Sequence, residues 1–340
     1  MQVLAAMSGG VDSSVAAALL AAEGHEVVGV TMKLWGGPSD TGCCSVADVI
    51  DARRVADALG LDHHVFNFGG DFSARVVDPY VADHTAGRTP NPCVECNRHI
   101  KFDRLLRRAE ALGFDAVATG HHARVVLRPD GARRLARGAD AAKDQSYVLY
   151  MLGQEALAKV LLPVGHMTKD RVRALAAELG LRTAAKPDST DVCFIQRGER
   201  GSFLAERMVP TPARVLDTSG LRLGEVPSVQ MVTLGQRKGL GVGGRERPMY
   251  VVDVDVAAGV VTVGDRADLL SDHQDVRDVT WTAEQPQGPV LVQTSAHGGP
   301  RPATLDGARV CWQAPQQRVA PGQSVVFYDG DEVLGGGIAA

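Results

Sequence analysis

The sequence predicts an α/β protein with an N-terminal doubly wound parallel sheet, a small β-rich middle domain and a C-terminal β-barrel. Two observations support this fold class. In the first 120 residues, short apolar and β-branched runs alternate with stretches of helical spacing, which is the pattern of a parallel sheet covered on both faces. After about Pro210 the helical periods disappear, and short β-rich runs alternate with glycine and proline turns.

The same patterns place the individual elements. Apolar and β-branched runs predict strands at 3–7, 26–32, 64–68 and 116–119, and later at 251–254, 260–263, 290–293 and 324–328. Helical spacing predicts helices at 15–22, 46–59, 97–112 and 169–179, each followed within two residues by a glycine. Residues 124–137 favour a hairpin that turns at Pro129-Asp130-Gly131. We expect three domains, at 1–207, 208–272 and 273–340.

The composition of the chain argues against several classes of protein. No apolar run is long enough to cross a bilayer, and the N-terminus lacks the pattern of a secretory signal, so we expect a cytoplasmic protein without a membrane partner. Six cysteines in 340 residues do not make a secreted disulfide scaffold. Because the formal net charge is −4, a nucleic acid would have to be held by local basic patches.

The segment from Ser8 to Ser13, SGGVDS, lies between a predicted strand and a predicted helix. Backbone N–H groups and the positive helix end can bind phosphate there, and glycines let it approach the backbone. The Walker pattern is absent from the chain, and the loop lacks the dinucleotide fingerprint. The loop resembles the S-G-G-x-D-S signature of the PP-loop ATP pyrophosphatases, which implies that Asp12 helps to hold Mg²⁺. The alternative is a turn of small residues that only tightens the junction.

Two cysteines lie in settings that favour thiol chemistry. Cys96 comes at or just before the start of the helix predicted from residue 97, where the helix dipole and neighbouring cations would favour a thiolate. Cys193 lies between polar turn residues and a short apolar run. Zinc binding is a weaker alternative, because the single C-x-x-C of Cys93 and Cys96 is only half a site. Ordinary packed or surface thiols are expected at the remaining positions, Cys43, Cys44 and Cys311.

Six motifs, spread in order over nearly the whole chain, are similar to those of the bacterial tRNA-specific 2-thiouridylase family, a branch of the PP-loop ATP pyrophosphatases. They are SGGVDSS (8–14), TPNPCVECNRHIKF (89–102), KDQSYVLY (143–150), PDSTDVCFI (187–195), LGQRKGLGVGG (234–244) and PGQSVVFYDGDEVLGGG (321–337). The loop alone also occurs in other ATP pyrophosphatases. The pairing of NPCVECN with DVCFI is much more specific.

The resemblance implies an enzyme that uses ATP and Mg²⁺ to adenylate the C2 oxygen of the wobble uridine of tRNA. Cys193 would receive sulfur from a donor protein, a cysteine desulfurase or its relay, and become a persulfide. Cys96 would attack the persulfide or assist the transfer, ending in a Cys96–Cys193 disulfide. A persulfide carrier and a resolving thiol are what such a transfer needs. The products would be 2-thiouridine, AMP and pyrophosphate.

The resemblance also implies the residues around each substrate. Those expected at ATP are Ala6, Met7, Ser8, Gly9, Gly10, Val11, Asp12, Ser13, Met32 and Gly120. Those expected at the flipped target base are Asn91, Pro92 and Cys93, and those expected at the rest of the tRNA are His121, Lys143, Asp144, Gln145 and Gln323. Many relatives carry aspartate where this chain has Cys93, so that thiol could move a proton or compete with Cys96.

Two rival functions share parts of this pattern. Another ATP pyrophosphatase, such as an amide-forming ligase, would use the loop but would not need Cys96 and Cys193. A non-catalytic RNA-binding or zinc-binding module would consume no ATP. The first rival predicts that activity survives when both cysteines are changed to serine. The second rival predicts that the protein does not turn over ATP.

Overall fold

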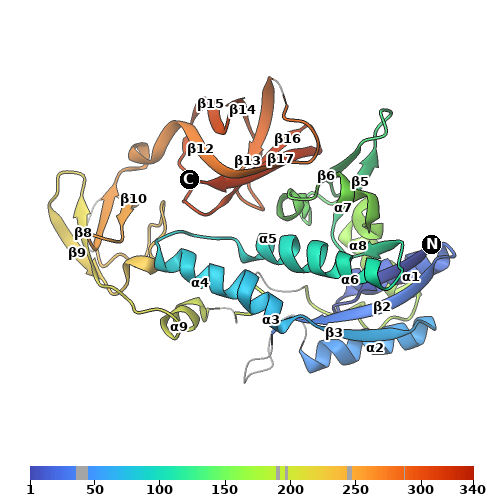
Figure 1. Ribbon diagram of the computed structural model, residues 1–340. Helices are drawn as coiled ribbons and strands as arrows, with labels where there is room; N and C mark the ends of the chain where they lie inside the picture. The colour runs from blue at the N-terminus through green and yellow to red at the C-terminus, as the bar shows by residue number, and fades with distance from the viewer. Residues whose placement is uncertain (36–44, 189–191, 196–197, 243–246, 287) are drawn as a thin grey trace.

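The computed structural model describes residues 1–35, 45–188, 192–195, 198–242, 247–286 and 288–340, so Cys43 and Cys44 lie outside it. The N-terminal part is built on a parallel sheet of order β3-β2-β1-β4-β7 (Figure 1). Its strands are β1 (Gln2–Ala6), β2 (Glu26–Lys33), β3 (His63–Asn67), β4 (Ala116–Ala118) and β7 (Val160–Leu161). The expected parallel sheet is confirmed.

Helices cover both faces of this sheet because its central strand is apolar on both sides. Val3 and Ala5 of β1 pack with α1 (Val11–Ala22), α2 (Val46–Leu59) and α8 (Lys169–Glu178). Leu4 faces the opposite side, where it packs in the cluster formed with the other group of helices. That group contains α3 (Gly69–Phe72), α4 (Asp78–Thr85), α5 (Pro92–Cys96) and α6 (Leu105–Ala111).

Two of these helices begin and end where the sequence indicates. Ser45 and Thr168 accept hydrogen bonds from the backbone N–H groups of Asp48 and Arg171 and so cap α2 and α8. Gly60 ends α2 in the left-handed region, at φ 68°.

The helical region from residue 69 to 111 is more continuous than the sequence pattern predicts. The π-helical segment η1 (Ser73–Val77) joins α3 to α4, and the π-helical segment η2 (Asn97–Arg104) joins α5 to α6. Sequence periodicity missed α3, η1 and α4, since two glycines and Pro79 interrupt the polar face and the π turns shift the helical period. Other short helices lie at α7 (Gln154–Lys159) and α9 (Arg200–Ala205).

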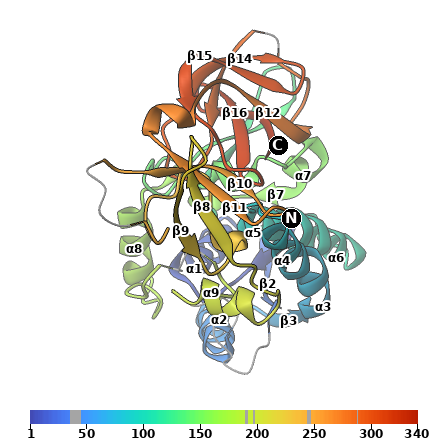
Figure 2. The ribbon, with the colours of Figure 1, turned by 90° about the vertical axis from the view of Figure 1, so that its left-hand side faces the viewer.

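The middle part of the chain forms a sheet of order β10-β11-β8-β9. Its strands are β8 (Ala213–Asp217), β9 (Arg222–Val226), β10 (Tyr250–Asp255) and β11 (Val260–Gly264). They have a separate core that includes Val215, Val251 and Val261. Figure 2 shows these strands between the C-terminal strands above and the N-terminal helices below. The β-rich middle domain is therefore confirmed.

The C-terminal strands form a closed barrel. Among the described residues its six strands follow the order β12-β15-β14-β13-β16-β17, and pairing of β17 with β12, for example Ala339 with Val276, closes it. The strands are β12 (Leu270–Trp281), β13 (Pro289–Gln293), β14 (Arg301–Asp306), β15 (Arg309–Gln317), β16 (Ser324–Asp329) and β17 (Glu332–Ala339). The expected barrel is confirmed.

The predicted hairpin joins the N-terminal part to the barrel. It consists of β5 (Ala123–Leu127) and β6 (Arg133–Arg137), and β6 extends the barrel sheet by pairing Ala136 with Glu332 of β17. Figure 1 shows the barrel above the long run from α5 to α6, with the hairpin at its side. No helix within the described ranges has the length and apolar character that a bilayer crossing requires.

Candidate active site

The loop from Ser8 to Ser13 follows β1 directly and includes the first turn of α1, which begins at Val11. β1 pairs with β2 on one side and with β4 on the other. In the order β3-β2-β1-β4-β7, strands β1 to β3 therefore extend the sheet in one direction, and β4 and β7 extend it in the other. Ligands of open parallel sheets bind at such a switch point, beyond the carboxyl ends of the strands. Ala6 and Met7 at the end of β1, Met32 near the end of β2 and Gly120 after β4 reach the same edge.

Two glycines allow the loop to pack tightly against its neighbours. A Cβ atom on Gly120 would lie 2.5 Å from the backbone nitrogen of Ser13 and 2.6 Å from the carbonyl carbon of Asp12. A Cβ atom on Gly9 would lie 2.4 Å from the carbonyl oxygen of Asp48, and Gly9 has a φ of +72°. Neither position can accept a larger residue without moving backbone.

The serines of the loop hydrogen-bond to one another and to the loop backbone. The Oγ of Ser13 accepts from the backbone N–H of Ser8 at 3.2 Å and donates to the carbonyl of Gly10 at 3.1 Å. Ser14 donates to the same carbonyl at 2.8 Å. Around Gly10 a Cβ atom would meet only the Oγ of Ser8, at 3.5 Å, so the backbone there is open to a ligand.

Asp12, on the first turn of α1, is held by two cationic or proton-donating side chains. The Nζ of Lys169 lies 2.8 Å and 2.7 Å from its two carboxylate oxygens, and the Nε2 of His122 lies 3.1 Å from Oδ1. Burial alone would raise the pKa of Asp12, but the hydrogen bonds from His122 and Lys169 outweigh it and lower the pKa below its ordinary value. Asp12 is therefore an ionised carboxylate at neutral pH.

Lys169 links Asp12 to a second carboxylate, Asp188. The Nζ of Lys169 lies 3.0 Å from Asp188, which also contacts Lys143 at 2.7 Å and Arg173 at 2.6 Å. Partial burial opposes ionisation, but hydrogen bonds from Lys143 and Lys169 hold the pKa of Asp188 well below its ordinary range. Sequence reasoning missed Lys169 and Asp188. The signal was the PDST motif, which was interpreted only through Cys193.

Lys186 ties the same segment to the other side of the loop. Its Nζ donates to the carbonyl of Gly9 at 2.9 Å and to the carboxylates of Asp48 at 2.7 Å and Asp51 at 2.9 Å. Asp48 lies on α2, the helix against which Gly9 packs. The segment leading to Cys193 therefore contacts the loop directly through Lys186 and indirectly through Asp188 and Lys169.

The environment of Cys96 differs from the sequence prediction. Asn91 caps a helix that begins at Pro92, so Cys96 is the fifth helical residue and not a residue of the first turn. It is 4 % exposed and immediately precedes the π-helical segment η2. The expected help from the helix dipole is therefore wrong for Cys96, since Cys93 occupies the N-terminal turn.

Cys193 packs against the same apolar cluster that contains Cys96. Its neighbour Phe194 is buried among aromatic rings, 5.5 Å from Phe72 and 5.7 Å from Tyr80 between ring centroids. This aromatic contact anchors the cysteine segment against α3 and α4. The structure thus brings the two cysteine motifs, roughly a hundred residues apart, into one cluster. Both are thiols in the structure.

The residues expected at the target base lie at the junction with the barrel. The side chain of Asn91 accepts the backbone N–H of Cys93 at 3.1 Å, and Pro92 is buried at the first helical position. Gln323, from the loop before β16, donates its side-chain amide to the carbonyl of Thr89. The barrel therefore contacts the chain just ahead of Asn91.

Three other residues expected at tRNA are engaged inside the protein. Asp144 is 7 % exposed and accepts hydrogen bonds from Arg137 at 2.9 Å and Ser146 at 2.8 Å. Gln145 accepts the backbone N–H of His122 at 2.9 Å. His121 is buried beside Thr119, and burial holds its pKa well below the ordinary value, so its ring is neutral at pH 7.

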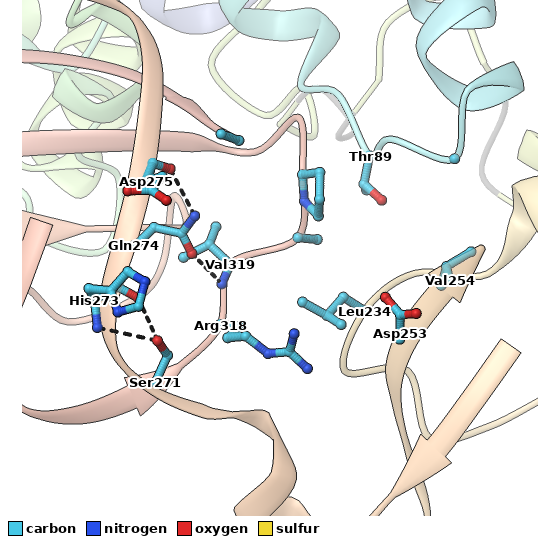
Figure 3. A pocket seen from close by; sticks show the side chains of 14 residues that line it. Thr89, Leu234, Asp253, Val254, Ser271, His273, Gln274, Asp275, Arg318 and Val319 are labelled. Atoms are coloured by element: carbon cyan, nitrogen blue, oxygen red, sulfur yellow. Dashed lines mark hydrogen bonds between the residues drawn. The ribbon is translucent and has the colours of Figure 1, made fainter. Parts of the chain in front are cut away.

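A separate cavity of about 230 Å³ lies where the three parts of the chain meet (Figure 3). It is lined by Thr89 from the N-terminal part, Leu234 and Asp253 from the middle part, and His273 and Arg318 from the barrel. Among the residues that the structure describes, none from the loop and no cysteine lines it. Within the described ranges, no three His, Cys, Asp or Glu side chains gather as they would around a metal ion.

Comparison with known proteins identifies the family. Family models described as tRNA methyl transferase HUP domain, tRNA methyl transferase PRC-barrel domain and Aminomethyltransferase beta-barrel domain match residues 1–197, 201–265 and 271–339. A solved 4-thiouridine synthetase–RNA complex with bound ATP is 22 % identical with a TM-score of 0.39, covering 56 % of this chain and 44 % of that one, a likeness too slight to support an argument.

Full-length relatives carry a more specific name. The protein named tRNA-specific 2-thiouridylase MnmA in Carboxydothermus hydrogenoformans is 45 % identical, covering 99 % of this chain and 96 % of the relative. The protein of the same name in Beutenbergia cavernae is 48 % identical, covering 98 % and 93 %. On this identity over nearly the full length, the chain belongs to the tRNA-specific 2-thiouridylase family.

Proposed function

We propose that this protein converts the wobble uridine of tRNA to 2-thiouridine, using ATP and the sulfur of a cysteine persulfide. One observation carries the proposal. The chain of contacts Asp12–Lys169–Asp188 connects the phosphate-binding loop to the segment that bears Cys193. An enzyme that must activate a base and then deliver sulfur to it needs these two functions in one site. The names of the full-length relatives support the same activity.

The residues at the loop fit a nucleoside triphosphate. The open backbone around Gly10 and the N-terminus of α1 provide N–H donors for phosphate, with Ala6, Met7, Ser8, Gly9, Val11 and Ser13 around them. Met32 and Gly120 lie at the same sheet edge, where the adenine would bind. When bound, ATP supplies the adenylyl group that makes the C2 oxygen of uridine a good leaving group. Asp12, an ionised carboxylate, is the side chain that would hold Mg²⁺.

The two cysteines would divide the sulfur chemistry between them. A donor protein passes a sulfane sulfur to the Cys193 thiolate, which becomes Cys193–S–SH. The Cys96 thiolate then attacks the inner sulfur, forms the Cys96–Cys193 disulfide and releases hydrosulfide, which adds at C2 in place of the activated oxygen. A thiol reductant restores both cysteines before the next cycle. Direct attack by the persulfide, assisted by Cys96, gives the same products.

The tRNA would lie across the N-terminal part and the barrel. Asn91, Pro92 and Cys93 border the proposed base pocket, and the contact between Gln323 and Thr89 brings the barrel to its edge. The base must leave its stack to reach such a pocket. Asp188 and the cations Lys143, Lys169 and Arg173 form what we call the Asp188 cluster. Lys143 is its most exposed cation and is proposed to contact tRNA. We propose that Asp144, Gln145 and His121 support this surface, since their side chains are bonded within the protein.

The proposal is tested by incubating the protein with tRNA, ATP, Mg²⁺ and a persulfide-loaded donor protein. We expect 2-thiouridine, AMP and pyrophosphate in equal amounts. The variant with both Cys96→Ser and Cys193→Ser should form no 2-thiouridine, while the matched variant Cys311→Ser, in barrel strand β15, should keep full activity. ATP turnover that survives the double change, with no 2-thiouridine from either protein, would point to another ATP pyrophosphatase. No ATP turnover at all would point to a non-catalytic binding protein.

A further inference from the structure

Thr89 lies at the point where the three parts of the chain meet. Its backbone N–H donates to the carbonyl of Pro321 at 2.7 Å, and its own carbonyl accepts from the side-chain amide of Gln323, both in the loop before β16. Its hydroxyl donates to the hydroxyl of Thr233, in the middle part, at 3.3 Å. Thr89 also lines the cavity at this junction, into which its side chain points in Figure 3. Each hydrogen-bonding group of Thr89 is thus used between parts of the chain.

Close packing fixes the chain around Thr89 on both sides. A Cβ atom on Gly322, which has a φ of +94°, would lie 3.0 Å from the backbone nitrogen of Thr89. A Cβ atom on Gly87 would lie 2.4 Å from Cγ2 of Val256, in the middle part. The barrel loop is itself held by β17, because the N–H of Gly322 donates to the carbonyl of Ala339 at 3.0 Å. Thr89 therefore sits against a fixed surface of the barrel.

A stiff link joins Thr89 to the helix that carries two of the thiols. The link is the sequence Thr89-Pro90-Asn91-Pro92, and Asn91 is extended, with φ −106° and ψ 97°. A proline fixes its own φ and restricts the residue before it, so two prolines in four residues leave this link little freedom. α5 begins at once and contains Cys93 and Cys96. A shift of Thr89 therefore moves the start of that helix.

We propose that Thr89 is a positioning residue, through which the barrel and the middle part set the place of α5. They thereby set where Cys93 and Cys96 lie relative to Cys193 when sulfur is delivered. The barrel then takes part in the sulfur chemistry, although it supplies none of these three thiols. The inference for the delivery step rests on the proposed function, whereas the placement of α5 does not.

Labelling of Cys93 tests the positioning without any turnover. Cys93 is partly exposed in the first turn of α5, so its reaction with iodoacetamide reports a shift of that helix. In Gly322→Ala the new methyl group meets Thr89, and the labelling rate of the Cys93 peptide should change at least about threefold. Gly307→Ala is the matched control, because Gly307 lies in the same barrel with a φ of +59° and open space around it. An unchanged rate in Gly322→Ala would overturn the inference, whether or not the protein makes 2-thiouridine.

Sulfur delivery tests the consequence for the reaction. With saturating ATP and tRNA, and with Cys193 loaded beforehand by the donor protein, Gly322→Ala should form 2-thiouridine at least about tenfold more slowly, since a small misplacement of a reacting group lowers the rate steeply. Loading of Cys193 should stay the same. An equal loss of loading and delivery would mean general damage and would overturn the inference. A natural protein that makes no 2-thiouridine would instead defeat the proposed function, while the labelling of Cys93 still decides the positioning.

Substitution of Thr89 itself separates positioning from packing. Thr89→Val keeps the shape of the side chain but removes the hydrogen bond to Thr233, so delivery should fall roughly threefold to tenfold. Thr89→Ser keeps the hydroxyl and should stay within about twofold of the natural protein. This pair also serves if Gly322→Ala does not fold. Equal delivery rates in the valine and serine variants would show that the hydroxyl positions nothing, contrary to the proposal.

Discussion

The ammonium of Lys169 lies within 2.8 Å of both carboxylate oxygens of Asp12, although 157 residues separate them in the sequence. The ammonium of a buried lysine thus contacts the carboxylate that the sequence resemblance assigns to Mg²⁺. A metal held by Asp12 would leave this ammonium to the phosphates of a bound nucleotide. The pair therefore connects the loop to α8, and we propose that Lys169 acts in ATP use.

Replacement of Lys169 by methionine should nearly abolish ATP use. Methionine keeps the length of the side chain but removes the charge, so pyrophosphate release in the presence of tRNA should fall about 100-fold or more. A pyrophosphate-release assay measures this. Lys159→Met is the matched control, because it removes the same charge from an exposed ion pair with Glu110. Near-normal turnover in Lys169→Met would show that the lysine only packs against Asp12.

The close packing of Gly120 predicts a selective effect on the nucleotide site. In Gly120→Ala the new methyl group meets the backbone of Ser13 and Asp12, so the loop must move. ATP affinity should fall at least about tenfold, and the far-ultraviolet circular dichroism should stay the same. Gly70→Ala is the control, because a Cβ atom there has open space around it and Gly70 lies in α3. Equal ATP affinity in both variants would contradict the role of Gly120.

Sequence reasoning located the loop, the barrel and most strands because these depend on local signals. Gly60 ends α2 as expected, since the backbone there is in the left-handed region, which glycine adopts readily. The helical start at Pro92 was missed because the expected amphipathic period becomes clear only after residue 97. Lys169 and Asp188 were missed for a different reason. Their roles come from contacts with Asp12 and Lys143 across the fold, and the PDST motif marks only the segment that holds Asp188, not those contacts.

His84 predicts how stability depends on pH. It is 2 % exposed, packs on Tyr80 at 4.6 Å between ring centroids, and lies near Arg200, Asp83 and the backbone of Gln230. Burial lowers its pKa to about 4, so the unfolded chain binds the proton near pH 6.5 and the folded chain does not. Stability present above that range is lost as the pH falls toward 4, by about 2 kcal/mol between pH 7.5 and 5.

Denaturant unfolding at the two pH values measures this loss. His84→Gln, which cannot titrate, should be less stable at pH 7.5 but should lose less on acidification. The difference between the two proteins isolates the histidine from the carboxylates, which titrate in both. An equal loss in both proteins would mean that His84 is not responsible.

Lys143 predicts a contribution to tRNA binding. Its side chain is 41 % exposed at the edge of the Asp188 cluster, where a phosphate of the tRNA backbone can reach it. Lys143→Ala should weaken tRNA binding by roughly threefold to tenfold and reduce the slope of log affinity against log salt by about one. Filter binding over a range of salt concentrations measures both. Arg171→Ala, at an exposed pair on α8, should change neither quantity. An unchanged salt slope in Lys143→Ala would exclude a phosphate contact.

The two cysteines of the shared cluster should perform separate steps. Cys193 is partly exposed and Cys96 is buried, so the donor protein should reach Cys193 first. Cys193→Ser should therefore accept no persulfide sulfur. Cys96→Ser should accept it but should form 2-thiouridine at least about 100-fold more slowly, because the expected resolving thiol is missing. Mass spectrometry of the loaded protein and nucleoside analysis of the tRNA measure the two steps independently.

Peptide mapping after one turnover decides which thiol resolves the persulfide. A Cys96–Cys193 disulfide is expected, and its formation requires the two Cα atoms to come within about 4.4–6.8 Å. Cys93 is the internal alternative, since it lies one helical turn before Cys96, in the N-terminal turn of α5. A Cys93–Cys193 disulfide would transfer the resolving role to Cys93, and Cys93→Ser would then be the variant that loads sulfur without delivering it. Full activity of Cys96→Ser, without any such linkage, would rule out a resolving thiol altogether.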